Sequence, residues 1–331
     1  MRVVKTLDAH AGGAPVRLIV DGARAPRGRT MRDKTVWMAR HADELRRMLM
    51  LEPRGHRDMT GAMLTEPVSP GSHAGLIFMN ADGYADLAGH AVIAVTTIAL
   101  TRGLLVSRSD DPTVVFDTVA GTVRTRLEAD TGSAGRMVHV TNVPSFVLQG
   151  GVRVKASGRQ VRADVAFGGM FYAIVDAESI GLSADLRHLS TLRAVSREVI
   201  ESIEAAVVVA HPTGAAMMGL AGTLFTGPSA SGETQLRNIT VLREGSAGRS
   251  PSGTGLSAVM AVLDAMGLVD EDAAFAQEGV FGERFTGRLA GRTMVGEHPA
   301  IVPEFSGSAW ITGEHSFLAD PADPFRDGAD V

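Results

Sequence analysis

The sequence predicts an α+β fold of two pseudo-symmetric, barrel-like halves, each a curved sheet around one central buried helix. Short β-branched runs bounded by glycine, proline, aspartate or asparagine fill most of the chain, which indicates many strands. Two segments of helical length, 89–103 and 253–267, are apolar on nearly every face, which is typical of helices enclosed by the fold. They start 164 residues apart, close to half of the 331-residue chain, and therefore indicate an internal duplication.

The remaining elements follow from local patterns. We expect strands at the β-branched runs 16–20, 75–79, 113–119, 136–140, 207–210 and 238–242. Helical period also marks residues 34–51 and 195–205, and the charged side chains around an apolar stripe make the first of these a surface helix. A strand pair that turns at a glycine should follow each buried helix, namely 117–126 at Gly121 and 282–290 at Gly287.

The two buried helices match each other at both ends. Ala88 and Ser252 each precede a glycine that opens the helix, and fifteen residues after each of them another glycine closes it. Coincidence between two glycine-bounded helices is the alternative in a chain with 38 glycines. If the halves are duplicated, a pseudo-twofold axis aims both helix starts at one cleft. The predicted halves are residues 1–140, together with a C-terminal segment of about 313–331, and residues 141–312.

Composition and charge exclude several classes of protein. Lys plus Arg number 32 against 37 for Asp plus Glu, a net charge of -5, so nucleic acid is not an expected partner. No window approaches about 18 uncharged apolar residues, so we expect no membrane span. The N-terminus lacks the apolar run of a signal peptide, and a cytoplasmic location is expected. The chain has no cysteine, and therefore no disulfide, thiolate metal site or cysteine nucleophile.

Unpaired N–H groups at a helix start, at the positive end of the helix dipole, suit a small anion. Two matched helix starts therefore predict a small, acidic ligand. The sequence leaves the oligomeric state open, with a homodimer among the alternatives.

Short motifs along the chain carry a family resemblance. In chain order they are Asp8-Ala9-His10 with Gly12-Gly13, Glu52-Pro53-Arg54-Gly55-His56 with Asp58-Met59, Gly83-Tyr84 before Gly89-His90, Gly168-Gly169 with Phe171-Tyr172, Arg249-Ser250-Pro251 before Gly253-Thr254-Gly255, and Trp310-Ile311-Thr312-Gly313. In this order they resemble the proline racemase superfamily, which includes proline racemases, hydroxyproline epimerases and trans-3-hydroxyproline dehydratases. The resemblance implies two halves similar to diaminopimelate epimerase, an active site between them and no cofactor.

The resemblance also shows what this sequence has lost. It implies one thiol in each half, at the positions of Ala88 and Ser252. Racemisation needs one group to remove the α-proton and another to deliver a proton to the opposite face, so we reject ordinary two-thiol racemisation for this chain. The family's dehydratases are similar at the second position, where they carry threonine, but they keep the first thiol. Gly248 stands where the family has an aspartate for the substrate nitrogen, and Ala11 and Ala14 replace a threonine and a glutamate.

The remaining residues define the expected site. The resemblance implies a small amino-acid-type carboxylate ligand, of the proline or hydroxyproline kind, whose carboxylate is bound by Gly89, His90, Gly253 and Thr254. Ser252 would polarise a leaving hydroxyl or orient the ligand, because a serine needs a neighbouring base to act in proton transfer. His90 is the best-placed base, and a structural cap or a hydrogen-bonded side chain is its alternative role.

Other charged motif residues fit structural roles better. His56 and Asp58, with Glu52 and Arg54, read more readily as an ion-pair network than as a site. A metal held by His10, His56 and His90 is not expected, because they lack the short spacing of a helix-borne pair. Two functions stay open: a dehydratase- or epimerase-like isomerase or lyase that uses groups other than thiols, and a silent binding protein that kept the site.

Overall fold

The computed structural model divides the chain into two compact units. Unit 1 comprises residues 1–140 and 308–331, and unit 2 comprises residues 141–307. The structure describes residues 1–107, 112–128, 136–271 and 273–329, so the last two residues of the predicted first half lie outside it. Unit 1 resumes at residue 308, whereas the predicted C-terminal segment of the first half starts at about 313, and the expected cleft between the halves stays a prediction.

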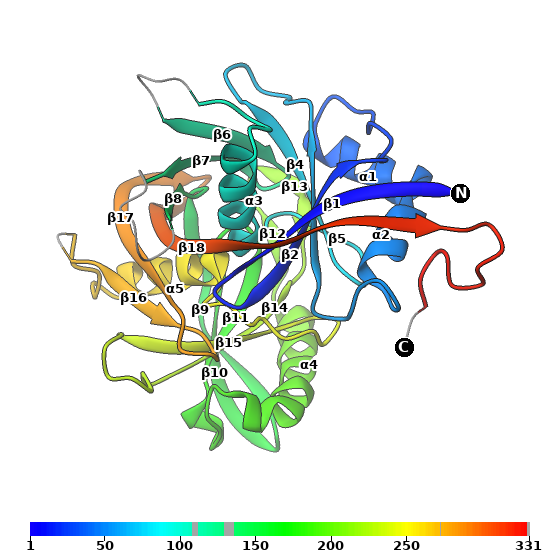
Figure 1. Cartoon of the computed structure of the whole chain (residues 1–331). Helices are drawn as coiled ribbons and strands as arrows, with labels where there is room; N and C mark the ends of the chain where they lie inside the picture. The colour runs from blue at the N-terminus through cyan, green and yellow to red at the C-terminus, as the bar shows by residue number, and fades with distance from the viewer. Residues whose placement is uncertain (108–111, 129–135, 272, 330–331) are drawn as a thin grey trace. The chain divides into compact units, whose positions relative to one another are not determined.

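Unit 1 is a ring of strands, labelled in Figure 1. Their order is β1-β2-β3-β4-β6-β7-β8-β18, and β18 also pairs with β1, which closes the ring; the short β5 pairs with β4. The strands are β1 (Arg2–Ala11), β2 (Ala14–Asp21), β3 (Thr60–Thr65), β4 (Ala74–Met79), β5 (Tyr84–Ala85), β6 (Thr113–Thr118), β7 (Gly121–Leu127), β8 (Met137–Thr141) and β18 (His298–Ala319).

Unit 2 repeats this plan with its own strands and with residues 298–307 of β18. The order is β9-β10-β11-β14-β15-β16-β17-β18, and β18 pairs with β9 to close the ring; β12 and β13 form a separate hairpin. The strands are β9 (Ser145–Ala156), β10 (Arg159–Phe167), β11 (Phe171–Asp176), β12 (Ala210–His211), β13 (Gly214–Met218), β14 (Gly222–Gly227), β15 (Leu236–Leu242), β16 (Phe275–Glu278) and β17 (Arg284–Val295). Short 3₁₀ turns lie at Glu178–Ile180 and Leu186–His188.

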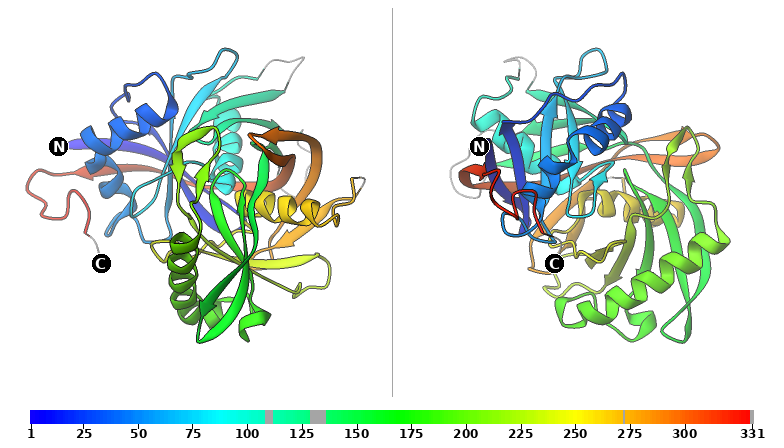
Figure 2. Two further views of the ribbon diagram at one scale, coloured as in Figure 1. Left: turned by 180° about the vertical axis from the view of Figure 1, so that it is seen from behind. Right: turned by 90° about the vertical axis from the view of Figure 1, so that its right-hand side faces the viewer.

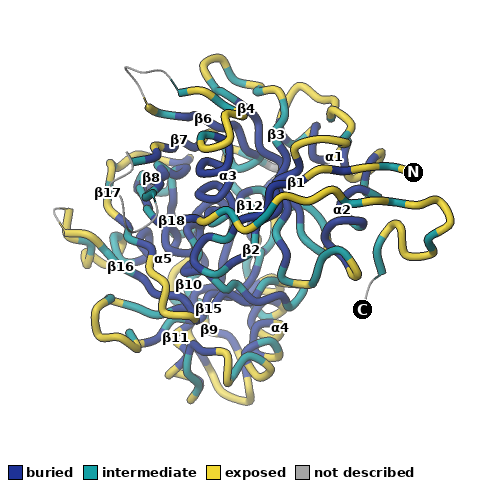
Figure 3. Tube along the Cα trace, viewed as in Figure 1, coloured by how far each residue is buried: buried dark blue, intermediate teal, exposed yellow. Residues whose placement is uncertain are grey.

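One apolar helix is buried against the strands of each ring. In unit 1, α3 (Gly89–Thr101) contacts β1, β2, β3 and β7, and the tube in Figure 3 is dark blue along it. In unit 2, α5 (Gly253–Ala265) contacts β9, β10, β11 and β17. Each helix ends at a left-handed glycine, Gly103 with φ +66° and Gly267 with φ +72°, where glycine has no steric penalty. Both predicted buried helices and the α+β fold are confirmed.

The other helices lie against the sheets. In unit 2, α4 (Leu189–Ala206) packs against β9, β14 and β15 (Figure 2). In unit 1, α1 (Met31–His41) contacts β4, and α2 (Asp43–Met50) contacts β3. The core beneath α1 and α2 is rich in methionine, whose flexible thioether fills irregular space. Its buried methionines are Met31, Met38, Met48, Met50, Met59, Met63 and Met79.

Three local predictions are wrong. The helix expected at 34–51 is interrupted at Ala42, which is buried and non-helical with φ −149° and ψ 22°. A new helix starts at Asp43, whose charge suits a first turn and which binds Arg46 at 2.7 Å. The strand expected at 207–210 begins only at Ala210, because α4 continues through Ala206.

Gly287 is the third correction, because it lies inside β17 and not at a turn. The chain turns at Gly282, with φ +82°, between β16 and β17. A Cβ at position 287 would lie 2.5 Å from the Met260 sulfur of α5. This glycine is therefore needed for the close approach of β17 to the helix. The strand pair at Gly121 is confirmed, since β6 and β7 pair there.

A buried ion pair ties β1 to β2 in unit 1. The Arg17 guanidinium donates to the Asp8 carboxylate at 2.9–3.2 Å and to the carbonyls of Leu49 at 2.8 Å and Arg54 at 2.6 Å. It also lies over the Phe317 ring, 4.3 Å from its centroid. This one side chain therefore links β1, the end of α2, the following loop and β18.

We expect Arg17→Met to lower the free energy of unfolding by about 3–5 kcal/mol, because it removes the guanidinium that pairs with the buried Asp8 carboxylate. Lys5→Met is the control, since the Lys5–Asp21 pair is exposed and such pairs contribute about 0–1 kcal/mol. Urea unfolding measures both. Equal losses in the two variants would contradict the assignment.

Candidate functional site

The start of α3 carries no side-chain acceptor. Ala88 is the N-cap residue in extended conformation, with φ −131° and ψ 100°, and makes no side-chain capping bond. Ala88 and Gly89 are both buried. A methyl group can neither accept from the first N–H groups nor exchange a proton. In unit 1 the expected anion contact therefore rests on backbone N–H groups and His90.

His90 occupies the first turn of α3 and reaches the start of β3. Its Nε2 lies 3.1 Å from the Thr60 hydroxyl oxygen. Burial lowers the pKa of His90 to about 4, because the charged ring loses its hydration. The imidazole is therefore neutral at pH 7. It is also a weak base there, because a general base works best with a pKa near the working pH.

The start of α5 is built around Ser252. This N-cap residue has φ +62° and ψ 100°, a left-handed value that is rare outside glycine. Its hydroxyl oxygen accepts from the Gly255 N–H at 3.0 Å, which leaves the hydroxyl hydrogen able to donate elsewhere. The serine is thus both a helix cap and a hydrogen-bond donor at the position where the resemblance implies the second thiol.

Close packing explains the glycines that flank Thr254. A Cβ at Gly253 would lie 2.5 Å from the Phe305 ring, and one at Gly255 would lie 2.7 Å from the Ser252 hydroxyl oxygen. Any larger residue would displace β18 or the cap. The Gly-Thr-Gly motif is therefore required by packing in unit 2, independently of any ligand.

The Thr254 side chain faces the interior of unit 2. Its hydroxyl lies 2.8 Å from the Tyr172 hydroxyl of β11, and both residues are almost fully buried. Burial raises the pKa of Tyr172 to about 12, opposed by hydrogen bonds with Thr254 and Ser252. Tyr172 therefore keeps its proton and does not serve Ser252 as a base. For Thr254, the backbone N–H remains as the expected contact with a carboxylate.

Gly248 lies in the loop between β15 and α5. Its N–H donates to the Thr240 carbonyl at 2.8 Å, and a Cβ there would lie 3.2 Å from the Thr240 Cβ. An aspartate at this position needs Thr240 to shift by a few tenths of an ångström. Gly248, Ser252, Gly253 and Thr254 are thus together in unit 2, and Ala88, Gly89 and His90 are together in unit 1. That both groups act on one ligand stays a prediction.

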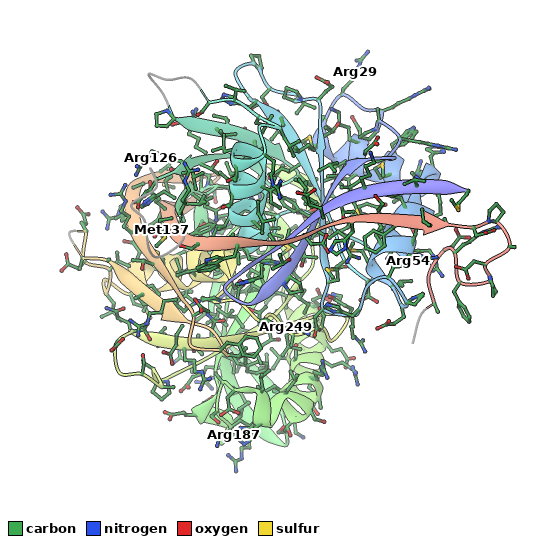
Figure 4. All side chains as sticks on the ribbon, viewed as in Figure 1. Arg29, Arg54, Arg126, Met137, Arg187 and Arg249 are labelled. Carbon is green, nitrogen blue, oxygen red and sulfur yellow. The ribbon has the colours of Figure 1, made fainter. Side chains whose placement is uncertain are left out.

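Other motif residues in unit 1 have structural partners. Arg54, labelled in Figure 4, binds Asp323 at 2.8 Å and the Phe325 carbonyl at 2.9 Å, which fastens the C-terminal segment. The His10 ring stacks on Trp310 with centroids 5.2 Å apart. No group of three potential metal ligands occurs in the part of the chain that the structure describes. Within that part, no helix is both long and apolar enough to span a membrane.

Sequence reasoning did not assign Thr60, Tyr172 or Phe305 to the site. Thr60 and Phe305 gave no signal, because their contacts join segments far apart in the chain. Tyr172 gave one: its strand reads FYAIV, and a buried tyrosine in an apolar run needs a hydrogen-bond partner.

Comparisons with known proteins agree on the family. The sequence model of the proline racemase family matches residues 6–330. The trans-3-hydroxy-L-proline dehydratase of Bacillus cereus is 34% identical over 327 residues, covering 99% of this chain and 98% of the relative. The chain therefore belongs to the proline racemase family.

Two solved structures are similar over almost their full length. A probable proline racemase from Agrobacterium radiobacter K84, with bound carbonate, has a TM-score of 0.91 and 31% identity, covering 99% of this chain and 96% of that one. A hydroxyproline epimerase from Agrobacterium vitis, with bound trans-4-hydroxy-L-proline, has a TM-score of 0.88 and 29% identity, covering 100% and 95%. The family thus includes racemases, epimerases and dehydratases that act on proline or hydroxyproline.

We expect the pKa of His90 to be about 4, well below the ordinary value of 6.5. Between these two pH values the unfolded chain binds a proton that the folded protein excludes, so stability falls as pH drops from about 6.5 to about 4. Above that window His90 makes no such contribution. His90→Gln should flatten this part of the stability curve, measured by urea unfolding at pH 7 and pH 5. An NMR titration that places His90 near 6.5 would contradict the burial argument.

Proposed function

We propose that this protein binds a proline- or hydroxyproline-type amino acid through its carboxylate, using the N–H groups at the starts of α3 and α5. We further propose that it converts the ligand by one-sided proton chemistry of the dehydratase or epimerase kind, with groups other than thiols. The observation that carries the proposal is the Ser252 hydroxyl at the start of α5, in a chain without cysteine. Family membership and the names of the relatives support the ligand class.

The chemistry of a hydroxyl favours dehydration over racemisation. In a β-elimination from a 3-hydroxyproline, a base takes the proton from the α-carbon, the C–O bond to the hydroxyl breaks, and the departing hydroxide takes up that proton and leaves as water. His90, a weak base, is the candidate for this role in the chain. The second group then has only to donate a hydrogen bond to the departing oxygen. Ser252 can do this while its own oxygen caps α5. In racemisation Ser252 would have to exchange a proton with the α-carbon, and a serine needs a neighbouring base for this.

The second candidate is a binding protein of the same fold that performs no reaction. Two observations favour it. Ala88 supplies no acid or base at the start of α3, and the low pKa of His90 makes that imidazole a weak acceptor at neutral pH. Both candidates share the ligand class and differ only in turnover.

We expect pyrrole-2-carboxylate and the hydroxyprolines to raise the melting temperature of the unmodified protein. A ligand that binds only the folded state stabilises it by about 2.7 kcal/mol at a hundredfold excess over its Kd. Thermal unfolding with and without ligand measures the shift, and pyrrole, which lacks the carboxylate, is the control. A shift that is equal with pyrrole would contradict carboxylate recognition.

We expect no rapid exchange of the proline α-proton for deuterium, because loss of a positioned acid or base slows reactions about 10²–10⁴-fold. Ala88→Cys combined with Ser252→Cys should restore measurable exchange, since a thiolate is stabilised at a helix N-terminus. Adding Gly248→Asp should raise it further if Thr240 adjusts. NMR in heavy water measures the exchange on L-proline and trans-4-hydroxy-L-proline.

The same assay separates the two candidates. Loss of trans-3-hydroxy-L-proline with formation of its dehydrated product, by the unmodified protein, supports the enzyme. Binding without turnover supports the silent protein. A protein that neither binds nor converts any proline-type acid, with a folded and inactive triple variant, would reject both.

A further inference from the structure

We propose that Asn238 and Gln277 are positioning residues that hold the Ser252 hydroxyl and the first turn of α5 in place. The proposal rests on the function proposed above, in which the start of α5 meets the ligand. Neither residue belongs to the family motifs in the sequence. Each acts through the Pro251 carbonyl, one residue before the helix cap.

The two amides converge on one oxygen. The Asn238 side-chain NH₂ donates to the Pro251 carbonyl at 2.7 Å, and the Gln277 side-chain NH₂ donates to the same carbonyl at 2.7 Å. Both side chains are fully buried. Asn238 lies on β15 and Gln277 on β16, which are adjacent parallel strands. The amide orientation is fixed, because an amide oxygen turned toward the carbonyl would repel it.

The Pro251 carbonyl that accepts both hydrogen bonds directly precedes Ser252, whose backbone is the most constrained of the site. Pro251 has a fixed φ, and Ser252 follows with φ +62°, so the peptide plane between them sets the direction of the cap. The Ser252 N–H donates to the Ser250 hydroxyl at 3.3 Å. The loop after β16 also packs here, since a Cβ at Gly279 would lie 2.9 Å from the Pro251 nitrogen. Two strands and this loop therefore hold the plane that orients Ser252.

Holding the Pro251 carbonyl with two buried amides costs stability, and the needs of folding alone do not explain that cost. The side-chain oxygens of Asn238 and Gln277 are buried without a hydrogen-bond partner among the described residues. One donor satisfies a backbone carbonyl, and each unpaired buried oxygen destabilises the fold. Two amides on one carbonyl are explained if the site needs the Pro251–Ser252 peptide held in a single orientation.

The chain offers a probe of this geometry that needs no ligand. Because it contains no cysteine, Ser252→Cys introduces a single thiol at the cap of α5. A thiol at a helix N-terminus has a lowered pKa and reacts faster with iodoacetamide at neutral pH. Its alkylation rate and pKa therefore report whether the side chain is held at the helix start.

We expect Asn238→Leu and Gln277→Leu, each in the Ser252→Cys background, to raise the thiol pKa and slow alkylation at pH 7. A rise of one pKa unit lowers the thiolate fraction about tenfold. The control is Ser196→Ala in the same background. Ser196 of α4 is also buried in unit 2, and its hydroxyl lies 3.0 Å from the Thr223 hydroxyl and 3.4 Å from the Val241 carbonyl, away from α5. This variant should lose stability without changing the thiol.

Asn238→Asp adds a pH-dependent rescue. The ionised carboxylate has no hydrogen to donate to Pro251, whereas the protonated acid does. Its alkylation rate, divided by that of the Ser252→Cys parent at the same pH, should therefore rise toward one as pH falls. A purely structural role would not produce this recovery in protein that circular dichroism shows to be folded at every pH.

Each outcome decides the proposal. Unchanged thiol reactivity in a folded variant at 238 and in one at 277 would overturn it, as would an equal change in Ser196→Ala. If the Leu variants do not fold, the Asn238→Asp ratio decides alone, and a ratio that does not vary with pH overturns it. Failure of every proline-type acid to bind the unmodified protein would reject the proposed function and leave the thiol readout intact, so the two failures are distinguishable. Where pyrrole-2-carboxylate does bind, its affinity should fall in Asn238→Leu and stay unchanged in Ser196→Ala.

Discussion

A helix enclosed by strands can bury its apolar sides, but its first N–H groups still need acceptors. This constraint shapes both units, because α3 and α5 are apolar almost throughout and begin inside their folds. In unit 2 the Ser252 hydroxyl accepts a hydrogen bond from one of these N–H groups, and the Ser252 backbone has a positive φ. In unit 1 the Ala88 methyl accepts none. The two helix starts are therefore chemically unequal although the surrounding architecture repeats.

This inequality limits the chemistry. A reaction that inverts a carbon centre needs competent groups on two faces. Ser252 can donate a hydrogen bond, while His90 is neutral and only weakly basic because burial lowers its pKa to about 4. Elimination of water needs a base and a hydrogen-bond donor, but it needs no second group that returns a proton to carbon. The residues present thus fit elimination or simple binding better than racemisation.

Much of the fold could be predicted because its signals are local. The lengths of α3 and α5 could be predicted from the glycines at both ends of each helix, and the glycine that closes each helix has a positive φ. The family could be predicted from the order of the motifs along the chain. The other features of the fold depend on contacts between segments that are far apart in the sequence, and these could not be predicted. The sequence predicts a turn at Gly287, and only the structure shows that this glycine is needed because Met260 packs against it. The break at Ala42 gave no signal, because the helical period of the sequence continues through it. For the site, the positions could be named, but the partnership of Thr254 with Tyr172 joins residues 82 apart.

The methionine-rich core of unit 1 has a consequence for oxidative damage. A thiol at a helix start is readily oxidised to a sulfenic acid, whereas a serine hydroxyl and an alanine methyl have no such chemistry. The sulfur of this protein lies in methionine alone, and Met38 of α1, Met48 of α2 and Met79 of β4 are buried in one core. Peroxide would therefore leave the helix starts chemically intact. Its damage would be methionine sulfoxide, formed first at exposed methionines such as Met218 and Met294. Loss of function would follow only when a core methionine is oxidised, because a polar sulfoxide does not fit the apolar packing.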